Sequence, residues 1–311
     1  MPLLRGLNDL DHWRSSVVAI GNYDGVHVGH QAMIAELRRS ADALGTRAIA
    51  MTFDPAPIEV LRPAAAPPRL MRLEQKAAYL EQAGADAVLA LPTDRRLLDL
   101  EPEAFFEEVL LARLDVSGLV EGPNFRFGRD RRGDAALLQT LCDRAKRSLS
   151  VVAPVNVGSE MVSSSRIRQC VSAGDLPSAS RMLTRPHEVL GTVVRGSDRG
   201  RKLGFPTANL SDIGTLLPPD GVYAGRTEIE QRSFAVAVHI GPNSTFAEDD
   251  RRFEAHLLDF DGDLYGRGLR VELIERLRGS VRFDSPQALV EQLQIDCDQV
   301  RELLATAPSD R

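Results

Sequence analysis

Short apolar runs alternate with helical patterns through the first half of the chain, and this alternation constrains the fold more than any other feature. The apolar runs occupy residues 17–20, 47–53, 86–91, 117–121 and 149–155. Apolar residues at helical spacing follow them near residues 30–44, 73–83, 102–113 and 134–147. Strands and helices that alternate in this way predict parallel βαβ units, and therefore an α/β domain with a doubly wound parallel sheet.

The composition is that of an ordinary globular protein. The chain has 311 residues, about two domains by length, with 43% hydrophobic and 26% charged residues. Its formal net charge of −6 argues against a general nucleic-acid binder or a protein that binds anionic membranes. Any site for an anionic ligand must therefore be built locally.

The cysteine pattern and the hydropathy of the chain indicate the cellular compartment in which the protein occurs. Cys142, Cys170 and Cys297 are scattered, without a CxxC pair or an even disulfide set, which fits a reducing interior. No apolar run reaches the ~18 residues that a membrane span needs, and no signal peptide precedes the first strand. We expect a cytoplasmic protein with no membrane partner.

The pattern changes after residue 185, where we place a domain boundary that gives domains 1–185 and 186–311. Two short helical stretches, 164–173 and 175–183, precede it. Beyond it, short alternating runs predict a small antiparallel barrel or sandwich, at residues 189–194, 221–229, 234–240, 253–260 and 269–277. Ser285 is a good N-cap for a final helix over 285–305, and Pro286 suits its first turn.

Glycines and two histidines follow the first strand, in the sequence GNYDGVHVGH over residues 21–30. Backbone N–H groups at a glycine-rich turn and a helix N-terminus form an anion site. His27 and His30 are three residues apart, so both can face that site and donate hydrogen bonds to phosphate oxygens. Alone, the pattern fits two exposed histidines beside an ordinary turn better than a phosphate site, because short motifs often match by chance. The pattern argues against a zinc protease site, because the i, i+4 spacing and the glutamate of such sites are missing.

Two further segments favour a nucleotide site. GPNFRFGRDRRGD (122–134) follows the fourth strand with Gly122, Asn124 and four arginines, and SSSRIR (163–168) opens a helix with hydroxyls and two arginines. Singly, they fit a solvated arginine loop and a serine-capped helix. Together with the histidine loop they give three anion-compatible segments at one sheet edge, as a nucleoside triphosphate would need. The P-loop, GxGxxG and GxSxG patterns are absent.

The second half carries a basic glycine-rich loop within GTVVRGSDRGRKLGFPTANL (191–210). Such a loop can fold over phosphates. Thr207 and Asn209 alternate along an extended segment and therefore share a face, and both are oxygen ligands suited to Mg²⁺ held together with phosphates. A long solvated hairpin loop is the alternative interpretation.

In the first half, GNYDGVHVGHQ, TFDPAP, GPNFRFG and SSSRIR resemble the adenylyltransferase half of the bacterial bifunctional riboflavin kinase/FAD synthetases. The resemblance implies an HxGH-type nucleotidyltransferase fold and transfer of AMP from ATP to FMN, with release of pyrophosphate. It implies that His27 and His30 are catalytic. It also implies ATP-binding roles for Gly21, Asn22, Asp24, Gly25, Gly29, Asn124, Ser164, Ser165 and Arg168.

One position departs from this pattern. Ala56 stands where the family has histidine in TFDPHP, so a donor near the nucleotide is missing. This predicts, as an alternative, a riboflavin kinase whose adenylyltransferase half is weakened or silent.

In the second half, the glycine-rich loop, GVYAG (221–225) and FEAHLLDFDGDLYG (253–266) resemble riboflavin kinase. The resemblance implies a six-stranded Greek-key barrel that transfers the γ-phosphate of ATP to the 5′-hydroxyl of riboflavin, with Glu254 as catalytic base. Mg²⁺ would be held by Thr207 and Asn209. The implied ATP- and flavin-binding residues are Gly196, Arg199, Gly200, Arg201, Gly204, Phe205 and Pro206.

Two further positions depart from the family, with His239 in place of an asparagine and Ser244 in place of a proline. A third interpretation is a flavin- or nucleotide-binding regulatory module with degenerate chemistry. The retained Thr207, Asn209 and Glu254, together with the histidine pair, argue against it.

Overall fold

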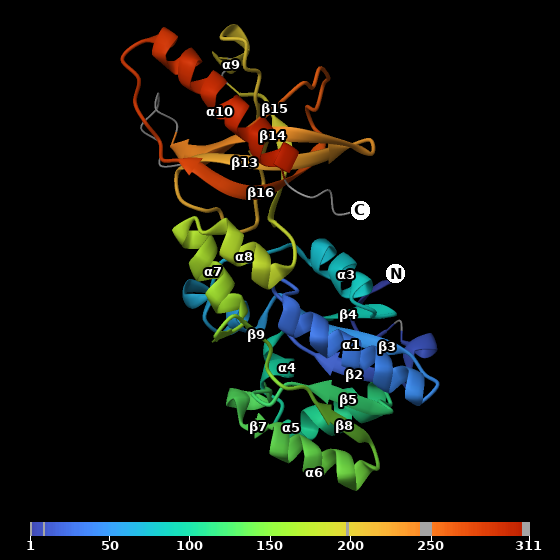
Figure 1. Cartoon of the computed structure of the whole chain (residues 1–311). Helices are drawn as coiled ribbons and strands as arrows, with labels where there is room; N and C mark the ends of the chain where they lie inside the picture. The colour runs from blue at the N-terminus through green and yellow to red at the C-terminus, as the bar shows by residue number, and fades with distance from the viewer. Residues whose placement is uncertain (1, 9, 197–198, 243–250, 307–311) are drawn as a thin grey trace. The chain divides into compact units, whose positions relative to one another are not determined.

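The computed structural model describes residues 2–8, 10–196, 199–242 and 251–306. The chain forms two compact units (Figure 1). The first contains residues 1–68 and 72–163, and the second contains residues 69–71 and 164–311. This division falls earlier than the predicted boundary at residue 185, because two short helices group with the barrel.

A six-stranded sheet with the order β1-β4-β3-β2-β5-β8 forms the first unit, and all of its neighbouring strands are parallel. Its strands are β1 (Leu3–Arg5), β2 (Val17–Ile20), β3 (Ala48–Asp54), β4 (Ala87–Pro92), β5 (Gly118–Glu121) and β8 (Ser148–Val151). The doubly wound parallel sheet is confirmed. The edge strand β1 was not predicted, because three residues are too short to give a periodic pattern.

The winding of the sheet reverses between β2 and β5. From β2 the chain adds β3 and β4 on one side, and then returns to place β5 and β8 on the other. In doubly wound sheets this reversal leaves a crevice at the carboxyl ends of the two central strands, where ligands bind. The glycine–histidine loop follows β2 directly.

Helices connect these strands. The α-helices of the first unit are α1 (Val28–Ala43), α2 (Pro57–Leu61), α3 (Leu73–Gln82), α4 (Arg95–Leu98), α5 (Pro102–Ala104) and α6 (Ala135–Ala145). A π-helical segment, η3 (Phe105–Arg113), continues α5, and single 3₁₀ turns are η1 (Asp11–Trp13), η2 (Pro63–Ala65) and η4 (Arg129–Arg131). Two small hairpins pair β6 (Arg126–Phe127) with β7 (Gly133–Asp134), and β9 (Asn156–Val157) with β10 (Glu160–Met161).

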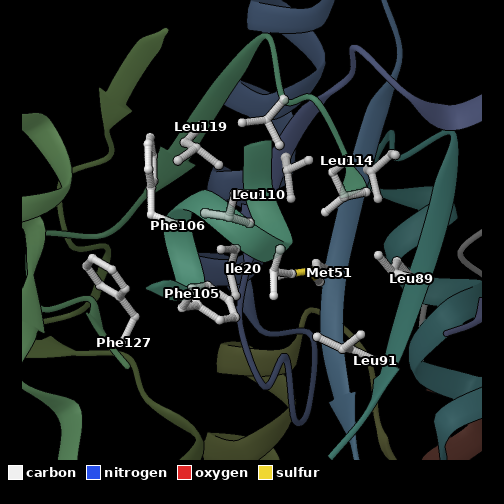
Figure 2. Close-up of a cluster of buried hydrophobic side chains, with 14 of the residues drawn as sticks. Ile20, Met51, Leu89, Leu91, Phe105, Phe106, Leu110, Leu114, Leu119 and Phe127 are labelled. Atoms are coloured by element: carbon white, nitrogen blue, oxygen red, sulfur yellow. The ribbon is translucent and has the colours of Figure 1, made fainter. Parts of the chain in front are cut away.

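The core of the first unit forms where η3 packs on the sheet (Figure 2). Phe106 and Leu110 of η3 belong to the same buried cluster as Ile20 of β2, Met51 of β3 and Leu89 of β4. All five are exposed by 3% or less, so the sheet has a rigid apolar base beneath its carboxyl edge.

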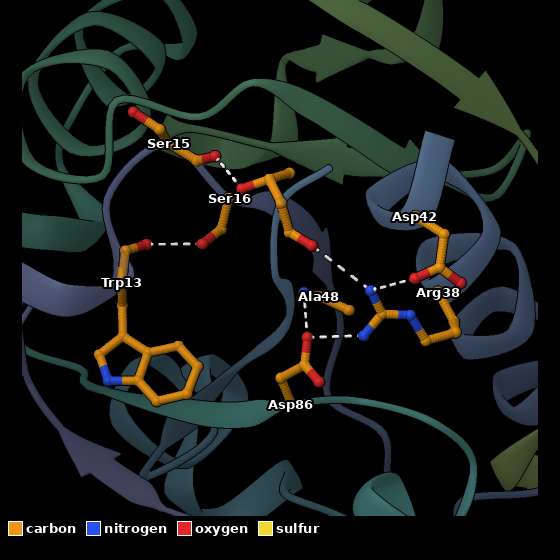
Figure 3. Close-up of polar contacts among 8 residues, drawn as sticks. Trp13, Ser15, Ser16, Arg38, Asp42, Ala48 and Asp86 are labelled. Atoms are coloured by element: carbon orange, nitrogen blue, oxygen red, sulfur yellow. Dashed lines mark hydrogen bonds and ion pairs between the residues drawn. The ribbon is translucent and has the colours of Figure 1, made fainter. Parts of the chain in front are cut away.

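Polar contacts fix the opposite, amino-terminal edge of β2 and β3 (Figure 3). Asp86 Oδ2 accepts hydrogen bonds from Ala48 N (2.8 Å) and from the guanidinium of Arg38 (2.6 Å). Arg38, on α1, also pairs with Asp42 at 2.6 Å. Ser16, before β2, donates to Trp13 O at 2.7 Å. These contacts attach α1 to the amino-terminal ends of β2 and β3. They lie at the opposite edge of the sheet from the loop that contains His27.

The second unit contains a closed antiparallel barrel with the order β11-β12-β15-β14-β13-β16. Its strands are β11 (His187–Val194), β12 (Ala208–Ser211), β13 (Gly221–Ile229), β14 (Arg232–Pro242), β15 (Arg251–Leu257) and β16 (Gly268–Arg278). Consecutive strands β13, β14 and β15 pair as neighbours, and β12 lies beside β15, which is a Greek-key arrangement. The predicted barrel is confirmed.

The described residues of the second unit include the helices α7 (Ser164–Ala173), α8 (Leu176–Leu183), α9 (Arg199–Lys202) and α10 (Pro286–Thr306). The predicted cap of α10 is confirmed, because Ser285 Oγ accepts a hydrogen bond from Ala288 N at 3.1 Å. No helix within the described ranges is long and apolar enough to cross a membrane.

Candidate active sites

The topology brings two of the three predicted anion-binding segments to one place. β2 and β5 pair in parallel, and their last residues, Ile20 and Glu121, lie at the same sheet edge. The loop from Gly21 to His27 leaves one strand, and Gly122 and Asn124 leave the other. Asn124 is exposed, so its amide is accessible at this edge.

The loop after β2 has an unusual backbone. Tyr23 (φ 48°), Gly25 (φ 91°) and Val26 (φ 38°) all have positive φ angles. A β-branched residue rarely takes this conformation, which persists only where neighbouring contacts impose it. Here Thr52 Oγ1 donates to Asn22 O at 3.3 Å, and Gln31 Nε2 donates to Val26 O at 3.0 Å. The loop is therefore held in shape before any ligand arrives.

His27 and His30 form a stacked pair, with ring centroids 3.7 Å apart and planes 16° apart. His27 is 6% exposed and caps α1, since its Nδ1 accepts a hydrogen bond from His30 N at 3.4 Å. His27 Nε2 is then the nitrogen that carries the proton in the neutral ring. The structure thus brings the two predicted histidines together at the start of α1.

Burial lowers the pKa of His30 well below its usual value, and the neighbouring His27 and Lys76 lower it further. His30 is therefore neutral at pH 7, and its Nδ1 is buried without a hydrogen-bond partner among the described residues. A phosphate anion placed here would favour the protonated ring, which could then donate to an oxygen.

Lys76 is a cation of this site that sequence reasoning missed. It lies on α3, where its Nζ donates to Thr52 Oγ1 at 3.3 Å and its charge acts on His30. Its position depends on how α3 packs beside β4 of the sheet, and no local motif signals that.

Glu121 and Tyr23 were also missed. Glu121 is 1% exposed at the end of β5, and its Oε1 accepts a hydrogen bond from Ile20 N at 2.8 Å across the switch point. Burial raises the pKa of Glu121 well above its usual value, which favours the neutral form of this carboxyl, while the hydrogen bond from Ile20 N acts in the opposite direction. Burial raises the pKa of Tyr23 well above its usual value, and the nearby Glu121 carboxyl raises it further.

Most of the arginines that follow Asn124 form ion pairs with nearby carboxylates. Arg126 pairs with Asp134 at 3.5 Å, while Arg129 and Arg132 both pair with Glu101. Their charges are offset locally, so they contribute less to an anion site than their number suggests.

The third predicted segment begins α7 and belongs to the second unit. Ser164 and Ser165 are its first two residues, and Arg168 lies one turn later. An ATP-binding role for these residues stays a prediction.

The glycine-rich loop of the second unit folds closely onto β12. A Cβ on Gly196 would come within 2.2 Å of Asn209 Nδ2, and a Cβ on Gly200 within 2.3 Å of Phe205 O. A side chain at Gly196 would have to push the Asn209 amide aside, whereas a side chain at Gly200 would collide with the backbone of Phe205. Arg199 opens α9, Arg201 and Gly204 are exposed, and Arg195 lies 5.7 Å from the ring of Tyr265. Ser244 lies outside the described residues.

The end of this loop is anchored to β15. His256 Nδ1 is 2.7 Å from Pro206 O, and the rings of Phe205 and His256 meet edge to face at 5.5 Å. Sequence reasoning gave His256 no role, because the contact joins residues fifty positions apart. The anchor places Thr207 at the entry to β12.

Asn209 and Glu254 face one another on neighbouring strands, β12 and β15. Among the described residues, no group of three or more His, Cys, Asp or Glu could hold a metal ion. Thr207 and Asn209 offer neutral oxygen donors, which suit Mg²⁺ when phosphates and water supply the other ligands. The donor set therefore fits a metal that is shared with a nucleotide.

Comparison with known proteins matches each half to a separate family. The FAD synthetase family model matches residues 9–166 and the riboflavin kinase model matches residues 183–304. The predicted boundary at residue 185 lies close to the start of the second match, whereas the compact units divide after residue 163.

Relatives match over nearly the whole chain. The bifunctional riboflavin kinase/FMN adenylyltransferase of Pseudomonas fluorescens is 38% identical, covering 98% of both chains. The protein of the same name from Escherichia coli K12 is 35% identical, covering 97% of both. A crystal structure titled macrolide-efflux protein, from Streptococcus pneumoniae, superposes with a TM-score of 0.86 at 29% identity, covering 97% of this chain and 99% of that one. The chain therefore belongs to the bifunctional riboflavin kinase/FMN adenylyltransferase family.

Proposed function

We propose that this chain makes FMN and FAD in two ATP-dependent steps. The second unit phosphorylates riboflavin to FMN, and the first unit transfers AMP from ATP to FMN and releases pyrophosphate. The observation that carries the proposal is that both family models match in this order, within relatives that align over nearly their whole length.

In the adenylyltransferase step, a phosphate oxygen of FMN attacks the α-phosphorus of ATP in line with the leaving pyrophosphate. Such a step needs positioning and charge stabilisation more than a covalent nucleophile. We assign those tasks to His27, His30 and Lys76, which gather at the start of α1, and to the backbone N–H groups there. Asn124 faces the same sheet edge and binds the nucleotide.

In the kinase step, Glu254 accepts the proton of the riboflavin 5′-hydroxyl as that oxygen bonds to the γ-phosphorus and ADP leaves. Thr207 and Asn209 would hold Mg²⁺ together with the ATP phosphates, and the bound metal would offset negative charge on those phosphates. Residues 204–206, which end the glycine-rich loop and are anchored through His256, border the nucleotide.

A second candidate follows from Ala56, which lies between β3 and α2. Its N–H donates to Glu59 Oε2 at 3.0 Å, but its methyl group offers no donor of its own. The first unit would then work slowly, and the chain would be chiefly a riboflavin kinase. In that case Ala56→His raises the rate of FAD formation from FMN, with kinase turnover as the internal control. An unchanged rate rejects this candidate.

We further infer a cytoplasmic protein whose partners are the small molecules ATP, riboflavin and FMN, without a nucleic-acid or membrane partner. The free cysteines Cys142, Cys170 and Cys297 support a reducing compartment.

Two variants of the full-length protein test which unit carries out which reaction. Glu254→Gln should abolish FMN formation from riboflavin and leave FAD formation from FMN intact. His30→Ala should do the reverse, with a loss of about 10²-fold or more, as expected for a residue that stabilises transition-state charge. If either variant lowered both activities equally, the assignment of one reaction to each unit would be wrong.

A further inference from the structure

The strand ladder between β12 and β15 stops one residue short of Thr207. Its last pair on the side of the glycine-rich loop joins Ala208 to Ala255. Residues 205–207 belong to no strand or helix. Continued by one step, the antiparallel register sets Thr207 opposite His256. The backbone that leads into β12 is therefore not held by strand pairing at the point where Thr207 lies.

The side chain of His256 contacts this backbone where the ladder stops. His256 Nδ1 lies 2.7 Å from Pro206 O. A carbonyl oxygen can only accept a hydrogen bond, so Nδ1 carries the proton and donates it. This hydrogen bond joins β15 to the residue directly before Thr207, and it replaces the strand pairing that ends at Ala208.

The ring of Phe205 is held by two sets of contacts. It meets the His256 ring edge to face, with the ring centroids 5.5 Å apart and the planes at 65°. It also packs against a buried apolar cluster that includes Cys297 and Val300 of α10. The end of the glycine-rich loop is thus fixed by a polar contact at Pro206 and by apolar contacts at Phe205.

Phe205 in turn holds the earlier part of the loop. Phe205 N donates to Gly200 O at 2.8 Å, and Leu203 N donates to the same oxygen at 3.0 Å. A Cβ on Gly200 would lie 3.6 Å from Thr207 Oγ1, so the loop backbone passes close to that hydroxyl. A displacement of Phe205 would therefore move the backbone at Gly200 and change the surroundings of Thr207.

We propose that His256 is a positioning residue for riboflavin phosphorylation, which holds the end of the glycine-rich loop in its nucleotide-binding form before ATP binds. This inference rests on the proposed kinase function. A loop that is already ordered binds its ligand without the conformational cost of ordering. Without the hydrogen bond, only a fraction of the molecules would have the loop in place, and the apparent affinity for ATP would fall by that fraction. Saturating ATP would order the loop in every molecule, so kcat would change little.

The test uses three substitutions of His256 in the full-length protein. His256→Phe keeps an aromatic ring and removes the donor, His256→Asn keeps an N–H group near the position of Nδ1 and removes the ring, and His256→Ala removes both. We expect the KM for ATP in riboflavin phosphorylation to rise about threefold to tenfold in His256→Phe, the factor that one hydrogen bond supplies, and less than about twofold in His256→Asn. His256→Ala should raise this KM at least as much as His256→Phe. In all three variants kcat should stay near the wild-type value.

Hydrogen–deuterium exchange of the ligand-free protein measures the order of the loop without any catalysis. The amides of Leu203 and Phe205 are protected by their hydrogen bonds to Gly200 O. A peptide that contains them should exchange faster in His256→Phe than in wild type, and at the wild-type rate in His256→Asn. Peptides from β11 and β16, which do not pair with β15, report whether the barrel is intact. FAD formation from FMN should be the same in all four proteins.

A wild-type KM for ATP together with wild-type exchange in His256→Phe would overturn the proposal. Equal effects in His256→Phe and His256→Asn would also overturn it, because the hydrogen bond would then not be what positions the loop. A fall in kcat at an unchanged KM for ATP would do the same. If His256→Phe does not fold, the comparison of His256→Ala with His256→Asn decides in the same way.

Failure of the kinase assignment gives a different result. In that case wild type itself forms no FMN from riboflavin, and the exchange measurement still decides whether His256 holds the loop. If wild type phosphorylates riboflavin while His256→Phe keeps both the wild-type KM for ATP and the wild-type exchange, only the positioning role of His256 is wrong.

Discussion

At the scale of single residues, the proposed adenylyltransferase site contains a buried carboxyl group, Glu121, whose pKa is raised by burial. Glu121 joins the ends of β2 and β5 through Ile20 N, and its Oε2 has no partner among the described residues. A charged carboxylate here would repel phosphate, whereas the neutral acid does not. Burial thus makes an acidic residue compatible with a site for ATP.

This burial makes stability depend on pH. The pKa of Glu121 is raised in the folded state, so folding binds a proton that the unfolded chain releases above its ordinary carboxyl pKa of about 4.3. The stabilising contribution is present below that value and is lost as pH rises toward the folded pKa.

We predict that Glu121→Gln, which has the same shape and no charge, is more stable than wild type, with an advantage that grows as pH rises above about 4.3. Trp13 is the only tryptophan and lies in the first unit, so its fluorescence during urea unfolding follows that unit. An advantage that stayed constant between pH 5 and pH 8 would contradict the assignment of a neutral Glu121.

Gly200 gives a second prediction at this scale. A methyl group there would approach Phe205 O to 2.3 Å, and backbone cannot move aside as a side chain can. Gly200→Ala should lower kinase kcat/KM by about tenfold or more, since small misplacements of binding groups have effects of that size. Gly268→Ala is the control, because a Cβ at Gly268 has nothing within 4 Å. Equal kinetics in the two variants would show that the loop adapts.

At the scale of elements, α10 is attached to the barrel by apolar contacts and by two ion pairs, of which Arg278–Asp296 is more buried than Arg301–Asp259. Arg278, at the end of β16, binds Asp296 through two hydrogen bonds of 2.9 and 2.7 Å. Asp296 is 1% exposed, so the ion pair is largely shielded from water. Replacing Asp296 with alanine would leave the Arg278 guanidinium without its carboxylate partner. Breaking one partner of a buried pair costs about 3–5 kcal/mol.

We therefore predict that Asp296→Ala speeds hydrogen–deuterium exchange in peptides from α10, by a factor that corresponds to local destabilisation of a few kcal/mol. Asp298 pairs with Arg301 on the exposed face of the same helix, with 62% of its side chain accessible. Asp298→Ala should change exchange little. Similar exchange in both variants would argue that apolar contacts alone hold α10.

At the scale of the whole molecule, the sequence predicted the elements with strong periodicity and the chemistry that follows them. The central strands, the barrel and the α10 cap were all evident from local patterns. β1 was too short to give a pattern, and Lys76 and Glu121 act through contacts between elements distant in sequence. The π-helical form of η3 likewise depends on packing against the sheet, because helical periodicity alone does not distinguish it from an α-helix.

The central claim is that one chain performs both reactions, and product analysis tests it most directly. Purified full-length protein with ATP and Mg²⁺ is given riboflavin in one reaction and FMN in another. A bifunctional chain gives FAD in both reactions, with FMN as an intermediate in the first. FMN from riboflavin without FAD in either reaction would leave a kinase with a silent first unit, and no product in either would contradict the account altogether.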